Sequence, residues 1–181
     1  MGDPGQDGVN DFAVGAPYSD GSGLQRGAVY LFQAPVSAGG ALDDADAIVR
    51  GGFNYALAGW SLGGGEDLDG DGVPDLLVGA KWQGSPGKIY AGAVYVFYDV
   101  GSGETSVLDA DRILQGTAAN DVAGQSAALI QDIDGDGLAD VLIGAVWHSP
   151  DGDREHAGAA YLVTSSQLEA LGSDPASLED A

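Results

Sequence analysis

The stretch that decides the fold is Asp67-Leu68-Asp69-Gly70-Asp71-Gly72-Val73-Pro74-Asp75, followed directly by Leu76-Leu77-Val78-Gly79-Ala80. Carboxylates stand at positions 1, 3, 5 and 9 of this loop, and glycines lie between them. This spacing folds the acidic side chains around one point, because glycine adopts positive φ angles at low cost. The apolar run that follows has the length and composition of a buried strand. The stretch therefore predicts a cation-binding loop that leads into a β-strand.

The same block is written three times along the chain. Its copies begin at Asp3, Asp67 and Asp132, a period of about 65 residues. A second landmark, Gly-Ala-Val-Tyr or Gly-Ala-Ala-Tyr, keeps step with the first at residues 27–30, 92–95 and 158–161. We therefore expect one segment built of three repeats, at about 1–51, 52–116 and 117–181.

Each full repeat predicts four short strands. The first precedes the acidic loop (58–64 and 123–130), the second follows it, the third lies at Gly-Ala-Val-Tyr, and the fourth lies at 47–51 and 112–116. The runs 76–78 and 141–143 do not alternate with polar residues, so we expect both faces of these strands to be buried between stacked sheets. Four short strands per repeat are typical of a propeller blade, which makes the chain all-β.

The acidic loops are best matched to calcium, which takes six to eight oxygen ligands and tolerates irregular geometry better than magnesium does. An EF-hand is excluded because its twelfth position needs glutamate, whereas Val14, Val78 and Ile143 stand there. Loop position 7 would contribute a backbone carbonyl. The predicted ligands are Asp3, Asp7, Val9 and Asp11 in the first loop, Asp67, Asp69, Asp71, Val73 and Asp75 in the second, and Asp132, Asp134, Asp136, Leu138 and Asp140 in the third. The alternative is that Asp and Gly merely mark hairpin turns.

The first loop should bind calcium more weakly than the other two. Gly5 stands where the later copies have Asp69 and Asp134, so this loop loses one carboxylate ligand. We thus expect up to three calcium sites in the chain, the first being the weakest.

Composition narrows the classes of partner. The chain has 28 acidic and 6 basic residues, a formal charge of −22, which disfavours nucleic acid and anionic membranes as partners. A solvated surface or adaptation to high salt would give the same excess of acidic residues. There is no cysteine, and no stretch approaches the roughly 20 apolar residues of a membrane span, so membrane insertion is not expected. The N-terminus has no signal-peptide pattern, so a secretion signal would lie upstream of this segment.

The acidic loops, Val14-Gly15-Ala16-Pro17-Tyr18 and the Gly-Ala-Val-Tyr strands resemble the FG-GAP repeats of integrin α subunits and related bacterial surface proteins. The Phe-Gly element is reduced to Gly59-Trp60 and Gly124-Gln125. The resemblance implies calcium-binding blades of a seven-bladed type of propeller, outside the cell or at its surface. Because propellers close with about four to eight blades, these three incomplete repeats would be a fragment of a longer propeller or assemble as a homo-oligomeric ring.

The resemblance also implies a partner-binding face. In that family the calcium loops lie on one face, and the loops between the second and third strands contact partners on the other, here residues 17–26, 81–91 and 146–157. Tyr18, Trp82 and Trp147 stand at matching positions in these loops. They would bind a protein or glycan, or alternatively pack against neighbouring blades.

Two smaller features complete the sequence. His148 and His156 lie near Asp151 and Asp153, where a second metal site or an acid-base pair can be imagined; the simpler interpretation is exposed loop residues. Ser166 and Glu169 form a possible capping box for a short helical turn.

We expect a binding module for adhesion or recognition rather than an enzyme. One alternative is an accessory propeller segment of a secreted hydrolase or lyase, since similar repeats accompany phospholipase and polysaccharide-degrading domains. The other is a structural segment that assembles into a closed ring.

Overall fold

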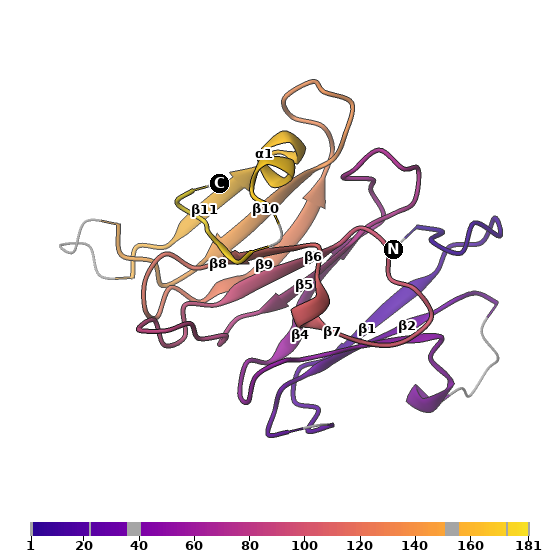
Figure 1. Cartoon of the computed structure of the whole chain (residues 1–181), viewed down its shortest axis with the longest axis horizontal. Helices are drawn as coiled ribbons and strands as arrows, with labels where there is room; N and C mark the ends of the chain where they lie inside the picture. Colours follow the sequence, from indigo (N-terminus) through magenta and orange to yellow (C-terminus); the bar gives the residue numbers. More distant parts are fainter. Residues whose placement is uncertain (1, 22, 36–40, 151–155, 173, 181) are drawn as a thin grey trace.

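A computed structural model describes residues 2–21, 23–35, 41–150, 156–172 and 174–180. The described chain is built mainly of β-strands, which form three sheets packed face to face in sequence order from the N-terminus to the C-terminus (Figure 1). This arrangement confirms the prediction of an all-β chain of propeller blades.

The strands are arranged in three sheets. The first has the order β1-β2-β3-β7, the second β12-β8-β6-β5-β4 and the third β11-β10-β9. Within each blade, successive strands pair antiparallel. The strands are β1 (Phe12–Ala16), β2 (Ala28–Phe32), β3 (Ala47–Arg50), β4 (Ala58–Gly64), β5 (Leu76–Ala80), β6 (Ala93–Phe97), β7 (Gly103–Ser106), β8 (Arg112–Gln115), β9 (Ala123–Ile130), β10 (Asp140–Ala145), β11 (Ala159–Val163) and β12 (Ala176–Ser177).

Two strands, β7 and β12, were not predicted. β7 pairs parallel with β3 of the first sheet, and β12 pairs parallel with β8 of the second, so each ties one repeat to the sheet before it. An ion pair supports the β7 contact: Arg50 Nε lies 2.8 Å from Glu104 Oε1. Sequence periodicity misses these strands because their partners lie in another repeat.

The hydrophobic core lies between the sheets. Val29 and Leu31 of β2 belong to the same buried cluster as Leu76 and Val78 of β5, which fills the space between the first and second sheets. A second cluster joins the opposite face of β5 and β6 to the third sheet. Fully burying a Leu or Val side chain contributes about 1.5–3 kcal/mol, so each interface is a substantial source of stability.

The prediction that both faces of 76–78 and of 141–143 are buried holds for the first run and is wrong for the second. Every residue of β5 is buried, whereas Leu142 in β10 is 41% exposed. The cause is tertiary, since the second sheet lies between two sheets and no sheet among the described residues covers the outer side of the third.

Glycine residues allow the backbones of neighbouring blades to come into direct contact. Gly27 and Gly92 have φ angles of 83° and 80° and form parallel bridges with Ala58 and Ala123, the first residues of the next blades. A Cβ atom on either glycine would overlap the backbone of that alanine. The left-handed backbone and the close approach both require glycine at these positions.

The C-terminal helical turn begins earlier than predicted. Helix α1 spans Ser165–Ala170, and its capping box joins Thr164 to Gln167 rather than Ser166 to Glu169. The reason lies outside the helix, because the N–H of Ser165 donates to Asp140 Oδ1 (3.1 Å) and fixes the first turn to the start of β10. In the part of the chain that the structure describes, no helix is both long and apolar enough to cross a membrane.

Candidate metal centre

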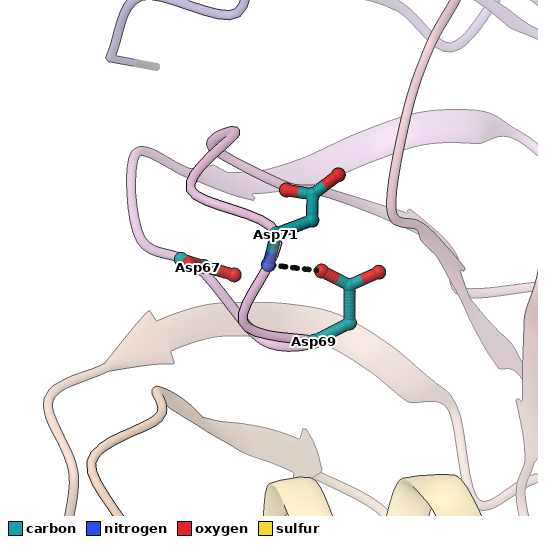
Figure 2. A group of neighbouring side chains, drawn as sticks. All are labelled: Asp67, Asp69 and Asp71. Carbon is teal, nitrogen blue, oxygen red and sulfur yellow. Dashed lines mark hydrogen bonds between the residues drawn. The ribbon is translucent and has the colours of Figure 1, made fainter.

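The second acidic loop gathers three carboxylates at one point. Oxygen atoms of Asp67, Asp69 and Asp71 all lie within 4.8 Å of one another, and these side chains are exposed or half-buried. Figure 2 shows the three side chains on one short loop, with the hydrogen bond between the N–H of Asp71 and the carboxylate of Asp69. Such a group of hard oxygen donors suits a calcium ion.

The backbone of this loop holds the carboxylates in place before any ion binds. Asp67 accepts hydrogen bonds from the N–H groups of Gly70 (2.7 Å) and Gly72 (2.9 Å), and Asp69 accepts one from Asp71 (3.1 Å). Gly70 and Gly72 have φ angles of 83° and 82°, which other residues rarely adopt. The sequence folds this way because short Asp side chains bond readily to backbone groups nearby in the chain.

Asp75, the fourth predicted carboxylate, lies beneath this group. Its side chain is 1% exposed, Oδ2 accepts the N–H of Leu68, and the buried Oδ1 has no hydrogen-bond partner among the described residues. Burial, followed by repulsion from the loop carboxylates, raises the pKa of Asp75 to about 8. An orphaned buried oxygen costs free energy unless a proton or a cation satisfies it, so the residues of this loop fit a calcium ion.

The raised pKa predicts a pH dependence of the calcium-free protein. An unfolded Asp titrates near 4, so the fold favours protonated Asp75, and the free energy of unfolding should fall as pH rises from about 4 to about 8. Calcium should offset this loss by replacing the proton. Asp75→Asn should flatten the pH profile and stabilise the calcium-free protein at pH 8, while weakening calcium binding. Urea unfolding between pH 5 and pH 8, with and without calcium, measures both effects.

Asp140 provides the matched control. It occupies the same loop position, but its two oxygens accept N–H groups from Ile133 (2.8 Å) and Ser165 (3.1 Å). Asp140→Asn should therefore destabilise the calcium-free protein at pH 8. An equal loss of stability in the two variants would contradict the role given to the orphaned oxygen of Asp75.

The third loop repeats the geometry of the second. Oxygen atoms of Asp132, Asp134 and Asp136 also lie within 4.8 Å of one another. Hydrogen bonds from the N–H groups of Gly135 and Gly137 lower the pKa of Asp132, so this carboxylate is held ionised and ready for a cation. The hydroxyl of Ser165 donates to Asp136 and links the loop to helix α1.

The first loop keeps the backbone pattern with fewer ligands. Asp3 accepts the N–H groups of Asp7 (3.1 Å) and Gly8 (2.7 Å), as Asp67 does for its own loop. Gly5 contributes no side chain; instead, its N–H donates to Asp11 (3.3 Å). The described residues of this loop do not form a three-carboxylate group. The backbone carbonyls of Val9, Val73 and Leu138 remain predicted ligands.

Exposed aromatic side chains lie at the other end of the same strands. β5 begins directly after Asp75 and ends two residues before Trp82, and five strand residues span about 17 Å. Tyr18, Trp82 and Trp147 follow the second strand of their blades and are 59%, 38% and 53% exposed. In each blade, the loop carboxylates and the aromatic residue are thus separated by the length of a strand.

The structure connects two of these aromatic residues through residues that the sequence did not single out as a site. Lys81 Nζ lies 2.9 Å from the ring centroid of Trp60 and 5.2 Å from that of Trp82. Trp60 also contacts Tyr18 edge-on (6.2 Å), and Trp82 contacts Tyr90 (5.8 Å). We call Tyr18, Trp60, Lys81, Trp82 and Tyr90 the aromatic cluster. The one sequence feature that pointed to this cluster is Trp60, which lies in the altered Phe-Gly element Gly59-Trp60.

One of the two histidines is partly buried, although both were expected to be exposed in a loop. The side chain of His148 is 13% exposed, and Nδ1 lies 3.1 Å from Oδ1 of the buried Asp121. The Asp121 carboxylate also accepts the hydroxyl of Thr117 (2.8 Å). His148 therefore anchors its loop to the preceding turn, whereas His156 is exposed as expected. Asp151 and Asp153, considered with them from the sequence, lie outside the described residues.

Comparison with known proteins finds the same repeat. The FG-GAP repeat family matches residues 58–97 and 123–163, the regions that contain the second and third acidic loops. Integrin alpha-5 of Xenopus laevis is 43% identical over 84 residues, which cover 44% of this chain and 8% of the integrin. Integrin alpha-PS2 of Drosophila melanogaster is 40% identical over 84 residues, covering 44% of the chain and 6% of that protein.

The same repeat links the chain to an enzyme. Phosphatidylinositol-glycan-specific phospholipase D of Bos taurus is 35% identical over 131 residues, which cover 68% of this chain and 15% of the phospholipase. The chain thus spans a small part of the relatives that it matches.

Proposed function

Because residues 58–97 and 123–163 are FG-GAP repeats and the chain is similar to integrin α subunits, we propose that it is a calcium-stabilised propeller module that recognises a protein or glycan outside the cell. The observation that carries this proposal is that two kinds of side chain lie at opposite ends of the second strand of a blade. In the second and third blades, converging carboxylates lie at one end of this strand, and an exposed aromatic side chain lies at the other.

Calcium at the acidic loops would act as a structural staple. In the second and third blades the loop joins the first two strands, so an ion bound there fixes the turn between them. Calcium outside the cell is abundant enough to fill even weak sites, with dissociation constants of about 10⁻⁴–10⁻³ M. Proteins carrying such loops would be loaded after secretion, which supports an extracellular location.

The aromatic cluster is suited to recognition. Large aromatic side chains that are partly exposed dominate the binding energy of many interfaces. Lys81 holds the rings of Trp60 and Trp82 through its ammonium group, so their orientations are set before a partner arrives. Trp147 would extend this surface to the third blade.

Alanine substitutions separate a binding role from a packing role. Trp147→Ala should change the free energy of unfolding by less than about 1 kcal/mol, because half of its side chain is exposed. It should nevertheless weaken binding at least about tenfold. Binding would be measured with calcium present, against immobilised glycans and purified extracellular-matrix proteins.

Ile133→Ala is the matched control, since Ile133 is 61% exposed at the carboxylate end of its blade. It should affect neither stability nor binding. An unfolded Trp147→Ala protein would assign Trp147 to packing instead. A folded variant that binds as tightly as the original protein would remove Trp147 from the interface.

A second candidate function rests on the phospholipase relative. Phosphatidylinositol-glycan-specific phospholipase D matches more of this chain than either integrin does, so the segment could serve as the accessory propeller of a secreted hydrolase. We expect this chain alone to release no product from vesicles containing a phosphatidylinositol-glycan lipid. Turnover that is abolished by a substitution within the chain would favour an enzyme.

A further inference from the structure

The second and third acidic loops contact one another directly. The backbone N–H of Ala139, at position 8 of the third loop, donates a hydrogen bond to the carbonyl of Asp67, at position 1 of the second loop (2.9 Å). Leu138 of the third loop also lies against Gly70, since a Cβ atom on this glycine would be 3.3 Å from Leu138 Cδ2. Each of these loops is therefore held partly by atoms of the other.

The hydrogen bond joins groups that belong to both predicted sites. Asp67 is a predicted ligand of the second loop, and its carboxylate accepts the N–H groups of Gly70 and Gly72. The N–H of Ala139 belongs to the same planar peptide group as the carbonyl of Leu138, the predicted position-7 ligand of the third loop. Fixing that carbonyl on a cation would also fix the N–H that Asp67 accepts. One peptide group thus connects the two loops.

Helix α1 makes a second connection between these loops. At its start, the hydroxyl of Ser165 donates to Asp136, and the N–H of Ser165 donates to Asp140 Oδ1 (3.1 Å). Both acceptors lie in the third loop. Further along the helix, Leu168 is 1% exposed and belongs to the same buried cluster as Leu68, the second residue of the second loop. The helix thus reaches from one loop to the other.

The first loop lacks the equivalent bond to its neighbour. Pro74 stands at position 8 of the second loop, where the third loop has Ala139, and proline has no N–H to donate to the preceding loop. Among the residues that the structure describes, no hydrogen bond joins residues 3–11 to residues 67–75. The second and third loops therefore form a pair from which the first is separate.

Two effects of opposite sign act between neighbouring cation sites. Repulsion between two bound cations lowers the affinity of the second site. The carboxylates that converge in each loop are exposed or half-buried, however, and salt at about 0.15 M screens such charges beyond about 8 Å. Ordering acts the other way, because a loop fixed by a bound ion also fixes the peptide group that it shares with its neighbour. Salt does not weaken this contact, so ordering dominates.

We propose that the second and third loops are a coupled pair of calcium sites, in which calcium at either loop raises the affinity of the other about fivefold or more. The first loop binds independently of this pair. The inference rests on the proposed calcium binding and adds a form of regulation to it. The pair fills over a narrower range of calcium concentration than two separate sites would.

Removing one site at a time tests the coupling. A two-dimensional NMR titration with calcium, followed on the amide signals of Gly72 and Gly137, measures the affinities of the second and third loops separately. Asp134→Ala should weaken binding at the second loop about fivefold or more. Asp69→Ala should weaken binding at the third loop by the same factor, because coupling between two sites is reciprocal. Asp7→Ala in the first loop is the control and should change neither affinity.

Ala139→Pro tests the hydrogen bond itself. It leaves every predicted ligand side chain in place, and Pro74 shows that this loop position accepts proline. In the Ala139→Pro background, Asp134→Ala should no longer weaken binding at the second loop. Ala139→Gly, which keeps the N–H, is the matched control and should retain the coupling. The two site removals decide the proposal even where Ala139→Pro does not fold.

The outcomes separate this inference from the proposed function. Calcium binding at both loops, with affinities that stay the same when the other site is removed, would overturn the coupling and leave the calcium sites in place. A lower affinity at one loop when the other is filled would overturn the coupling as well. If calcium shifted the amide signals of neither loop, the proposed calcium binding and this inference would fail together.

Discussion

Millimolar calcium should raise the melting temperature of this protein by about 10–20 °C. The second and third loops each bring three carboxylate groups together, which leaves like charges close to one another without an ion. A ligand present at about 100 times its Kd stabilises the folded state by about 2.7 kcal/mol per site, so two sites give about 5 kcal/mol. For a domain of this size, 1 kcal/mol shifts the melting temperature by about 2–4 °C. Differential scanning calorimetry with calcium or with a chelator measures the shift.

Substitutions assign this effect to the loops. Asp67→Ala and Asp132→Ala should each remove about half of the calcium-dependent shift, and calorimetric titration should lose one strong site in each variant. Asp3→Ala should remove little, because Gly5 leaves the first loop without a carboxylate at loop position 3. Asp43→Ala removes an exposed carboxylate elsewhere and should leave the shift intact. If calcium left the melting temperature of the protein unchanged, the acidic loops would be turns without a bound ion.

Gly79→Ala should destabilise the protein by about 3 kcal/mol or more. A Cβ atom at this position would overlap the hydroxyl of Ser61 and the backbone carbonyl of Gly124 in the next blade. The carbonyl cannot rotate away, so the second and third sheets must separate and lose part of the apolar contact between them. Insertions into a packed interior typically cost about 1–3 kcal/mol, and backbone obstruction places this one at the upper end. Urea unfolding with calcium present measures the loss.

The chain contains its own controls for this substitution. Gly144→Ala changes the equivalent position in the third blade, where the new methyl group meets the side chain of Ser126 rather than a backbone atom. It should cost less than about 1 kcal/mol. Gly101→Ala introduces a methyl group with no atom within 4 Å and should be neutral. Similar losses for Gly79→Ala and Gly144→Ala would show that the carbonyl of Gly124 is not the obstacle.

The strands and loops could be predicted because their signals are local. The strand before the second acidic loop was expected at residues 58–64, where β4 lies, and the loop carboxylates converge as their spacing indicates. Three aligned copies strengthened each signal. Whether the backbone carbonyls of Val73 and Leu138 join the carboxylates on a calcium ion stays a prediction.

Features that depend on a partner distant in the sequence were missed. β7 and β12 were not expected because short polar segments become strands here only by pairing with β3 and β8. No local pattern connects Lys81 to Trp60, or His148 to Asp121. Each of these contacts joins segments that are brought together by blade packing.

By itself, the sequence determined that this chain is built of repeats with acidic loops, whose strands stack as propeller blades. Residue spacing within a loop, and the order of apolar runs within a repeat, are short-range properties that a linear chain displays directly. Only the tertiary structure decided which strand faces are covered. Leu77 and Leu142 follow nearly identical loops, yet one is completely buried and the other is 41% exposed. The physical reason is that burial depends on the neighbouring sheet, and a repeat does not encode whether another repeat packs against it.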